Sequence, residues 1–222
     1  NSYTEQGVSL THMEHSVPFA KLSSMRQEAA DNRNALIAAA RQLFLSEGAG
    51  VSMRAIAKSA SVGVATAARH FPERIDLLDA VSAQAVDEIT EVVEQHLANS
   101  DLDPRSTWRA TVHAIAELEL AALAQAIFTD TMQLPDASTQ RQRIMENRIA
   151  DIRKVYEQLL APAKRAGLCP ADVDPLDFHL ALGIVTRPLP VDAPELPTRT
   201  PMRNRLIDVM LDGLEAQANA AE

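Results

Sequence analysis

Near the N-terminal end of this 222-residue sequence, basic side chains outnumber acidic ones, and arginine and lysine offer the chemistry of anion binding there. Residues 21–76 contain eight basic and five acidic residues, a net charge of plus 3, whereas the part from residue 77 onward has a net charge of minus 10. The whole chain has a net charge of minus 9. A basic end on an acidic body is typical of a protein that presents one end to phosphate.

Catalytic and metal-binding patterns have little support. The sequence contains no glycine-rich phosphate loop, no nucleophile elbow and no His-Glu-x-x-His motif, and acids scattered along helices are usually solvated. His12 and His15 lie in a polar N-terminal stretch, and Cys169 and His179 are far from other ligand types. We therefore expect no enzyme activity, no cofactor and no metal. The single cysteine cannot form an internal disulfide, which favours a reducing cytoplasm.

Several aromatic, methionine and histidine side chains in the second half of the chain are candidates for a small-molecule pocket. Pockets are mainly apolar with a few converging polar groups, and Trp, Tyr and His combine both properties. Core packing is the alternative interpretation for most of them, since cores need the same residue types. His113 and Tyr156 stand out, because a buried polar tip requires a partner or a ligand. The candidates are Trp108, His113, Phe128, Met132, Met145, Tyr156, Phe178 and His179.

Helices must position these side chains. Apolar residues make up 46% of the chain and aromatic residues only 4%, and alanine and leucine supply most of the apolar surface. Alternating strand-like runs are absent, so composition predicts an all-α fold. No run of eighteen apolar residues occurs, and the first twenty residues lack a basic stretch followed by an apolar core. We therefore expect no membrane partner and no export signal.

The residues that start and end helices are easiest to identify in the N-terminal third of the sequence. An apolar repeat of three and four residues predicts a first helix over residues 31–47. Ser52 is placed as the N-cap of a short second helix over residues 53–58. A tight turn follows at residues 59–63, and a third short helix is expected at residues 64–70.

This order of helices predicts a helix-turn-helix, in which the last helix enters the major groove of DNA and the helix before it crosses the backbone. The connecting turn requires small residues, which Ser61 and Gly63 supply. The apolar side chains of Ile56, Val62 and Phe71 are placed to pin the two short helices to the first one. An ordinary packing hairpin is the alternative interpretation of the same spacing.

The remainder of the chain predicts a helical bundle, which brings the total to about nine helices. The later helices are expected from Pro72 to about residue 97, over 104–132 with a break near 121–124, from Pro135 to about residue 167, over 175–186 and over 201–218. The proline-rich stretch at 187–200 cannot be regular. The expected domains are a flexible tail at 1–30, a helix-turn-helix domain at 31–76 and a helical ligand-binding and dimerisation domain at 77–222.

Three stretches resemble the N-terminal domain of TetR-family transcriptional regulators. They are Arg33-x-x-Leu36-Ile37-x-Ala39-Ala40-x-x-Leu43-Phe44, Ile56-Ala57 and the run ASVGVATAARHFPER at residues 60–74. The resemblance covers about residues 31–80, and beyond it the acidic all-helical remainder is similar in architecture. Membership of this family implies a homodimer that binds a palindromic double-stranded DNA operator, usually as a repressor released by a small-molecule effector.

The resemblance also implies roles for single residues. Ser52 would offer its hydroxyl to a phosphate, Arg54 and Arg69 would reach a phosphate or a base edge, and Thr66 suits a thymine methyl group or a phosphate. The residues expected at the DNA are Arg33, Ser52, Arg54, Gly63, Val64, Ala65, Thr66, Arg69, His70 and Arg74.

The sequence departs from the family pattern at two positions. Ala68 stands where the family usually has a tyrosine, and Arg74 where it usually has a lysine. Arginine keeps the charge. Loss of the tyrosine hydroxyl removes an expected phosphate contact, so DNA shape and apolar contacts carry more of the specificity. A helical ligand-binding or interaction protein with weakened DNA binding is the alternative function.

Dimerisation is expected through the last two helices. Apolar spacing and the resemblance together indicate this pair. The residues expected at the dimer interface are Leu180, Ile184, Leu206, Val209, Met210 and Leu214.

Overall fold

The computed structural model describes residues 19–48, 50–98, 103–133, 138–187 and 199–220. Every regular element within these ranges is an α-helix, which confirms the all-α class, and nine helices are present there. They are α1 (Phe19–Glu47), α2 (Met53–Ser59), α3 (Val64–His70), α4 (Arg74–Ala98), α5 (Pro104–Glu117), α6 (Leu120–Gln133), α7 (Ser138–Arg165), α8 (Pro175–Thr186) and α9 (Arg199–Ala220).

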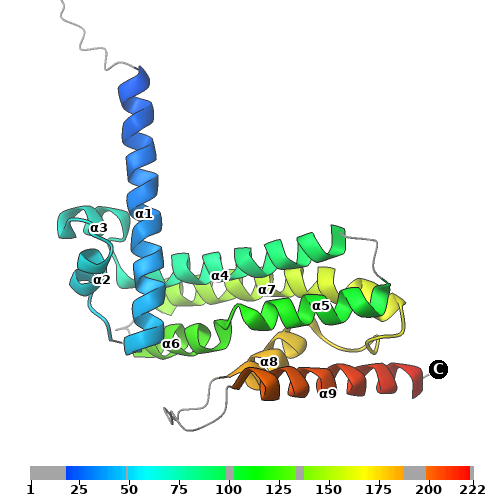
Figure 1. The fold of residues 1–222 in the computed structure, drawn as a ribbon. Coiled ribbons are helices and arrows are strands. Elements are labelled where there is room, and N and C mark those ends of the chain that lie inside the picture. Colours follow the sequence, from blue (N-terminus) through cyan, green and yellow to red (C-terminus); the bar gives the residue numbers. More distant parts are fainter. Residues whose placement is uncertain (1–18, 49, 99–102, 134–137, 188–198, 221–222) are drawn as a thin grey trace, which may run out of the picture.

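The helices form a small head and a larger body (Figure 1). The head consists of α1, α2 and α3, with the two short helices packed against α1. Helix α4 leads from the head into the body, where it packs against α5, α6 and α7. Helices α8 and α9 pack against each other, and they contact the rest of the body mainly through α7 and α5 respectively.

The head has a hydrophobic core of its own. Leu36 and Phe44 of α1, Ile56 of α2 and Phe71 after α3 are buried together with Leu78 of α4. The buried apolar positions recur at the helical spacing that predicted them. The core fixes α2 and α3 on one side of α1, as expected for a helix-turn-helix.

The body has a second core, which contains most of the aromatic residues. Trp108 of α5, Tyr156 of α7 and Phe178 of α8 are buried there, with Leu160 and Leu211. Helix α4 contributes its first half to the head core and its second half to the body core. It is therefore a structural element that the two parts share.

Helix α1 is longer than the sequence predicted. It begins at Phe19, so residues 19–30, expected as part of a flexible tail, are helical; residues 1–18 lie outside the described residues. The expectation depended on apolar periodicity, which residues 19–30 lack. No proline or glycine interrupts residues 19–47, and Ala, Lys, Met and Gln in this stretch favour a helix.

Two other helix boundaries differ from the expectation. Helix α4 begins at Arg74, two residues after Pro72. The break between α5 and α6 lies at residues 118–119, before the expected 121–124, and Glu119 adopts a left-handed φ of 53° there. A glutamate gives no sequence signal for this conformation. The expected start of α7 at Pro135 and most of the proline-rich stretch lie outside the described residues.

Candidate nucleic-acid interface

Helix α2 is held at both its start and its inner face. The Oγ atom of Ser52 accepts a hydrogen bond from the backbone N–H of Ala55, with an N···O distance of 3.2 Å, which confirms Ser52 as the N-cap. Ile56 and Ala57 are fully buried against the rest of the head. The outer face of α2 therefore has one fixed orientation, and Arg54 projects from it.

The turn between α2 and α3 differs from the expectation in one residue. Ser61 has a left-handed φ of 56°, whereas Gly63 has a φ of −62° and is the N-cap of α3. The backbone N–H of Val62 donates to the carbonyl oxygen of Ala57 at 2.9 Å and closes the turn. Gly63 is therefore not needed for its backbone freedom. It is exposed, and its lack of a side chain leaves the start of α3 uncovered.

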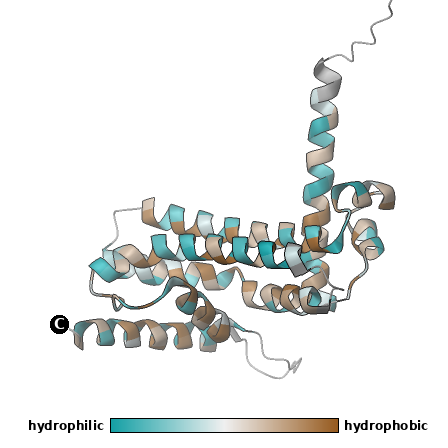
Figure 2. Ribbon diagram, turned by 180° about the vertical axis from the view of Figure 1, so that it is seen from behind, coloured by the Kyte–Doolittle hydropathy of each residue, from teal (hydrophilic) through white to brown (hydrophobic). Residues whose placement is uncertain are grey.

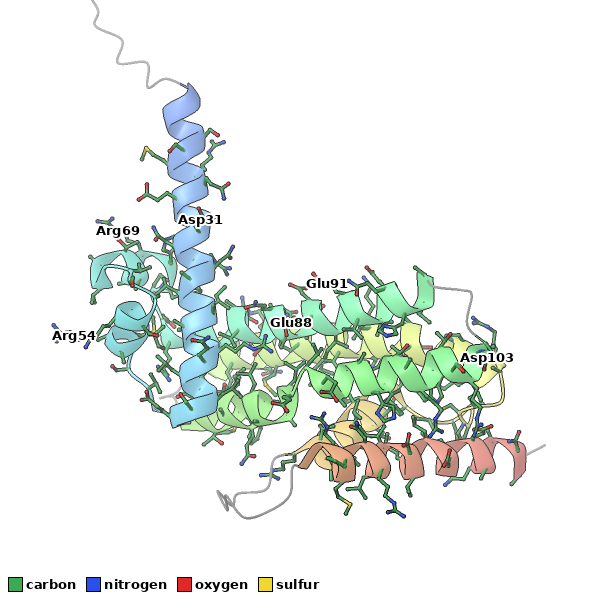
Figure 3. The ribbon with its side chains drawn as sticks, viewed as in Figure 1. Asp31, Arg54, Arg69, Glu88, Glu91 and Asp103 are labelled. Carbon is green, nitrogen blue, oxygen red and sulfur yellow. The ribbon has the colours of Figure 1, made fainter. Side chains whose placement is uncertain are left out.

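Helix α3 has one buried and one exposed face. Ala67 and the adjoining Phe71 are buried in the head core. Val64, Ala68 and Arg69 lie on the exposed side. Figure 3 shows Arg54 and Arg69 projecting on the same side of the head, from α2 and α3.

A shallow hollow lies between α2 and α3 on this outer surface. Exposed polar side chains of α2 and small residues at the start of α3 form its walls, and these are Ser52, Arg54, Ala55, Lys58, Val62, Gly63 and Val64. Lys58 was not among the sequence-based candidates. It lies four residues after Arg54, so both cations are on one face of α2, and this spacing was a signal that the sequence already contained.

Arg33 also lies at this side of the head. Its guanidinium carbon is 5.2 Å from the centre of the Phe71 ring, a cation–π geometry, and the side chain remains exposed. The structure thus brings the N-terminal half of α1 next to the C-terminal end of α3. His70, in the last turn of α3, is partly buried.

Arg74 has different surroundings from the other expected DNA-binding residues. Its Nε atom donates to Asp130 Oδ2 of α6 at 2.8 Å, and its Nη1 atom donates to the carbonyl oxygen of Val51. The guanidinium carbon lies 5.6 Å from the centre of the Phe44 ring. The Asp130 side chain is only 7% exposed. The charge of Arg74 is therefore paired inside the protein, where it joins the head to α6.

Four of the expected pocket residues form an aromatic cluster in the body. The ring of Phe178 lies 5.3 Å from that of Trp108 and 5.9 Å from that of Tyr156, measured between ring centres. The ring of His179 lies 5.0 Å from that of Tyr156. Three helices, α5, α7 and α8, thus supply the cluster.

Two polar atoms in this cluster are buried without a hydrogen-bond partner, namely Nε1 of Trp108 and Nδ1 of His179. Burial lowers the pKa of His179, which keeps the imidazole neutral. Burial also raises the pKa of Tyr156 far above its ordinary value. The cluster is therefore an uncharged environment with unsatisfied hydrogen-bonding groups.

The other expected pocket residues do not join the cluster. Phe128 and Met132 are exposed on α6, and Met145 is partly buried on α7. His113 points to α9, where its Nε2 atom donates to Asp208 Oδ1 at 2.8 Å. Helical spacing predicted the helices that carry these residues, but it did not predict which faces of those helices pack together.

Charged pairs connect α5 and α9 along their length in an antiparallel ladder. The hydrogen bond from His113 lowers the pKa of Asp208, and Arg109 also pairs with this carboxylate at 2.7 Å. The other pairs are Arg105 with Glu215 and Asp212, Arg109 with Asp212, and Arg203 with Glu117 and Glu119. Because α9 buries Ile207 and Leu211 against the same core, the ladder fixes which face of α9 points outward.

That outward face of α9, with the adjacent face of α8, is apolar. Ile184 is 75% exposed and Val209 is 63% exposed, and Leu180 and Leu206 are also exposed. Figure 2 shows hydrophobic residues recurring along these two helices. The other two residues expected at a dimer interface, Met210 and Leu214, are instead partly buried against the body core of their own chain, because they share a face with Ile207 and Leu211.

No single described helix is both long and apolar enough to cross a membrane, whereas α5 and α6 pass that test of length and composition only as a pair, bent by 50°. In the described ranges, no three His, Cys, Asp or Glu side chains are grouped so that they would hold a metal ion. His12 and His15 lie outside these ranges. Cys169 is buried, and burial raises its pKa to about 11.

Two family models match this chain in consecutive regions. Residues 36–81 match the model of bacterial regulatory proteins of the tetR family. Residues 103–216, just over half of the chain, match the C-terminal domain of SbtR-like transcriptional regulators. This chain belongs to the TetR family. TetR-family regulators are DNA-binding proteins without enzymatic activity, so the head is a DNA-binding domain and the protein is a transcriptional regulator.

Solved structures of TetR-family regulators share the fold over most of both chains. A TetR transcription regulatory protein from Mycobacterium vanbaalenii is 26% identical, with a TM-score of 0.60 over 86% of this chain and 98% of that one. Mycobacterium smegmatis AmtR is 28% identical, with a TM-score of 0.53 over 85% and 91%. A TetR regulator from Streptomyces coelicolor is 26% identical, with a TM-score of 0.54 over 82% and 97%. No curated protein sequence matches this chain.

Proposed function

We propose that this TetR-family regulator is a cytoplasmic repressor that binds a palindromic operator as a homodimer and leaves it when a small molecule binds the body. The observation that carries the proposal is the outer surface of α2 and α3. Arg54, Lys58 and Arg69 project from two short helices whose other faces are buried in the head core. A rigid surface with exposed cations fits the major groove and its phosphates.

This surface has few polar side chains that could form specific hydrogen bonds with bases. Ala65 and Ala68 are exposed on α3, and Thr66 is partly exposed beside them. We assign contacts with thymine methyl groups and recognition of DNA shape to this small apolar face. Arg69 supplies a contact with a phosphate or a guanine, and Ser52, Arg54 and Lys58 supply contacts with the backbone.

A gel-shift titration against the DNA upstream of the protein's own coding region tests operator binding. Arg69→Ala is expected to weaken binding by about 1–3 kcal/mol per contact, roughly 5- to 150-fold, without a change in dimer mass. Arg165→Ala is the matched control, because it removes an exposed arginine at the end of α7. No sequence preference of the wild type over competitor DNA at moderate salt would support the alternative, a helical ligand-binding protein with weakened DNA binding.

We assign the dimer interface to the apolar face of α8 and α9, on which the second copy of the chain would pack. Exposed apolar side chains at this density on adjacent helices are rare on monomers and typical of an interface. Two heads held by this face would read half-sites one helical turn apart, roughly 34–36 Å. Light scattering tests this assignment: Ile184→Glu is expected to give a monomer, and a wild type that is already monomeric would contradict it.

The effector site is assigned to the aromatic cluster of α5, α7 and α8. The unpartnered Nε1 of Trp108 and Nδ1 of His179 are the groups that a bound molecule would satisfy. Trp108 is the single tryptophan of the chain, so its fluorescence reports on this site directly. Solvent extraction of the purified protein and mass spectrometry identify a co-purified ligand, and adding that ligand back is expected to change the fluorescence of Trp108 and release the operator. A ligand that releases the operator without affecting Trp108 would place the site elsewhere.

A further inference from the structure

The N-terminal part of α1 extends beyond the head (Figures 1 and 2). The side chains of residues 23–31 are all exposed, and the first α1 residue in the head core is Leu36. At a rise of about 1.5 Å per residue, the segment from Phe19 to Arg33 is roughly 21 Å long. We call residues 19–33 the α1 extension. Its length corresponds to about six base-pair steps of about 3.4 Å.

The charged residues at positions 23–33 of the α1 extension are divided between two sides of the helix. At about 100° per residue, Arg26 lies within about 20° of Arg33 around the helix axis. Glu28 and Asp31 lie on the opposite side, roughly 140–160° away from Arg33 by the same geometry. The Asp31 carboxylate also accepts a hydrogen bond from the Gln27 side chain of the same helix, at 2.9 Å. One side of the extension is therefore cationic.

The cationic side continues the surface of the head that faces DNA. Arg33 stacks on Phe71, the residue that follows α3, so this side of α1 is turned toward the recognition helix. Between Arg33 and Arg26 the same side carries only Ala29 and Ala30, which leave both guanidinium groups accessible. Within the described residues, no hydrogen bond or ion pair engages Arg26, and its side chain is exposed.

We propose that the α1 extension is a second DNA-binding surface, on which Arg26 contacts a backbone phosphate outside the half-site read by α3. The helix is about 10–12 Å wide with its side chains, whereas the minor groove is about 6 Å wide, so the extension lies over the backbone and does not enter that groove. A contact of this kind adds affinity and salt dependence but no direct base readout. In a dimer the contact occurs twice, once beyond each half-site. The inference rests on the proposed operator binding.

The test uses the full chain and an operator obtained by selection from random-sequence DNA. Fluorescence anisotropy measures binding to two duplexes, one that ends at the palindrome and one with eight further base pairs on each side. For the longer duplex, Arg26→Ala is expected to weaken binding about tenfold at 0.15 M salt and to reduce the slope of log K against log salt by about 2, one unit for each protomer. For the shorter duplex the change is expected to be less than twofold.

Matched variants separate a phosphate contact from a general effect. Arg26→Lys keeps the charge and is expected to restore the slope. Arg165→Ala removes an exposed arginine at the other end of the molecule and is expected to leave both duplexes unaffected. Circular dichroism of Arg26→Ala is expected to match the wild type, which shows that the extension is still helical.

Three results would overturn the inference. If Arg26→Ala binds both duplexes like the wild type while Arg69→Ala weakens binding, the operator function stands and the extension has no part in it. If Arg26→Ala weakens both duplexes equally, the residue acts within the half-site. If the wild type selects no DNA sequence at all, the proposed function fails, and the inference fails with it.

Discussion

The two cores of this regulator differ in how completely their polar groups are satisfied. In the aromatic cluster of the body, Nε1 of Trp108 and Nδ1 of His179 are buried without a hydrogen-bond partner. Within the described residues, α1, α2 and α3 contain no such atom. A saturated core suits a rigid domain that presents a fixed surface to DNA. A core with unsatisfied donors and acceptors is suited to taking up a ligand.

The largest effect is expected from Phe71→Ala in the head. Phe71 is buried, closes α3 and supports Arg33, so its removal leaves a cavity and frees the recognition helix. The free energy of unfolding is expected to fall by about 3–5 kcal/mol. Urea denaturation followed by circular dichroism measures it. A loss below about 1 kcal/mol would mean that the head core is not as tightly packed as its burial indicates.

The junction between the two parts is tested by Asp130→Asn. This change leaves the guanidinium of Arg74 without its counter-charge in a mostly buried site and is expected to cost about 3 kcal/mol. The double variant Arg74→Met with Asp130→Leu removes both charges and is expected to recover most of the loss. Denaturation curves of the three proteins give the comparison. Equal stability of the single and double variants would show that the loss comes from packing and not from the unpaired charge.

The structure of the head was easier to predict from the sequence than that of the body, because the head depends more on local signals. In the head, local signals decide the structure: Ser52 caps α2, and the apolar spacing of Leu36 and Phe44 marks the buried face of α1. The pairing of Arg74 with Asp130 could not be predicted, because the two residues lie 56 positions apart in the chain. The left-handed Ser61 was identified only as a small turn residue, since no residue type specifies that φ here.

In the body, the positions of the pocket candidates depend on long-range packing. Sequence periodicity found the helices that carry Trp108, Tyr156 and Phe178, but it gives no information on how three helices turn toward one another. His113 was singled out for its polar tip, and its partner proved to be Asp208 of α9, 95 residues further along the chain. The α1 extension was missed for the opposite reason: its side chains at residues 23–31 are exposed, and it has no apolar repeat.

The pH dependence of stability separates the body from the head. Because burial lowers the pKa of His179 in the folded protein, the unfolded chain binds more protons below the ordinary histidine pKa of about 6.5. Stability is therefore expected to fall as the pH decreases from 7.5 to 5, and His179→Phe is expected to flatten this dependence. Urea denaturation at several pH values measures it. His96→Gln on α4 is the control, and an equal flattening by that variant would remove His179 as the cause.

The smallest effect on stability is expected from Trp108→Phe, although Trp108 is as buried as Phe71. The change removes part of a large ring, which costs packing, but it also removes the unpartnered Nε1–H donor, whose burial costs about 1–3 kcal/mol. The two terms nearly cancel, so the free energy of unfolding is expected to change by less than about 1 kcal/mol. A ligand that accepts a hydrogen bond from Nε1 reverses this balance, and Trp108→Phe then weakens ligand binding while stability and operator affinity stay the same. A loss of several kcal/mol in the ligand-free protein would show that Nε1 already has a partner, which would leave Nδ1 of His179 as the unsatisfied group of the aromatic cluster.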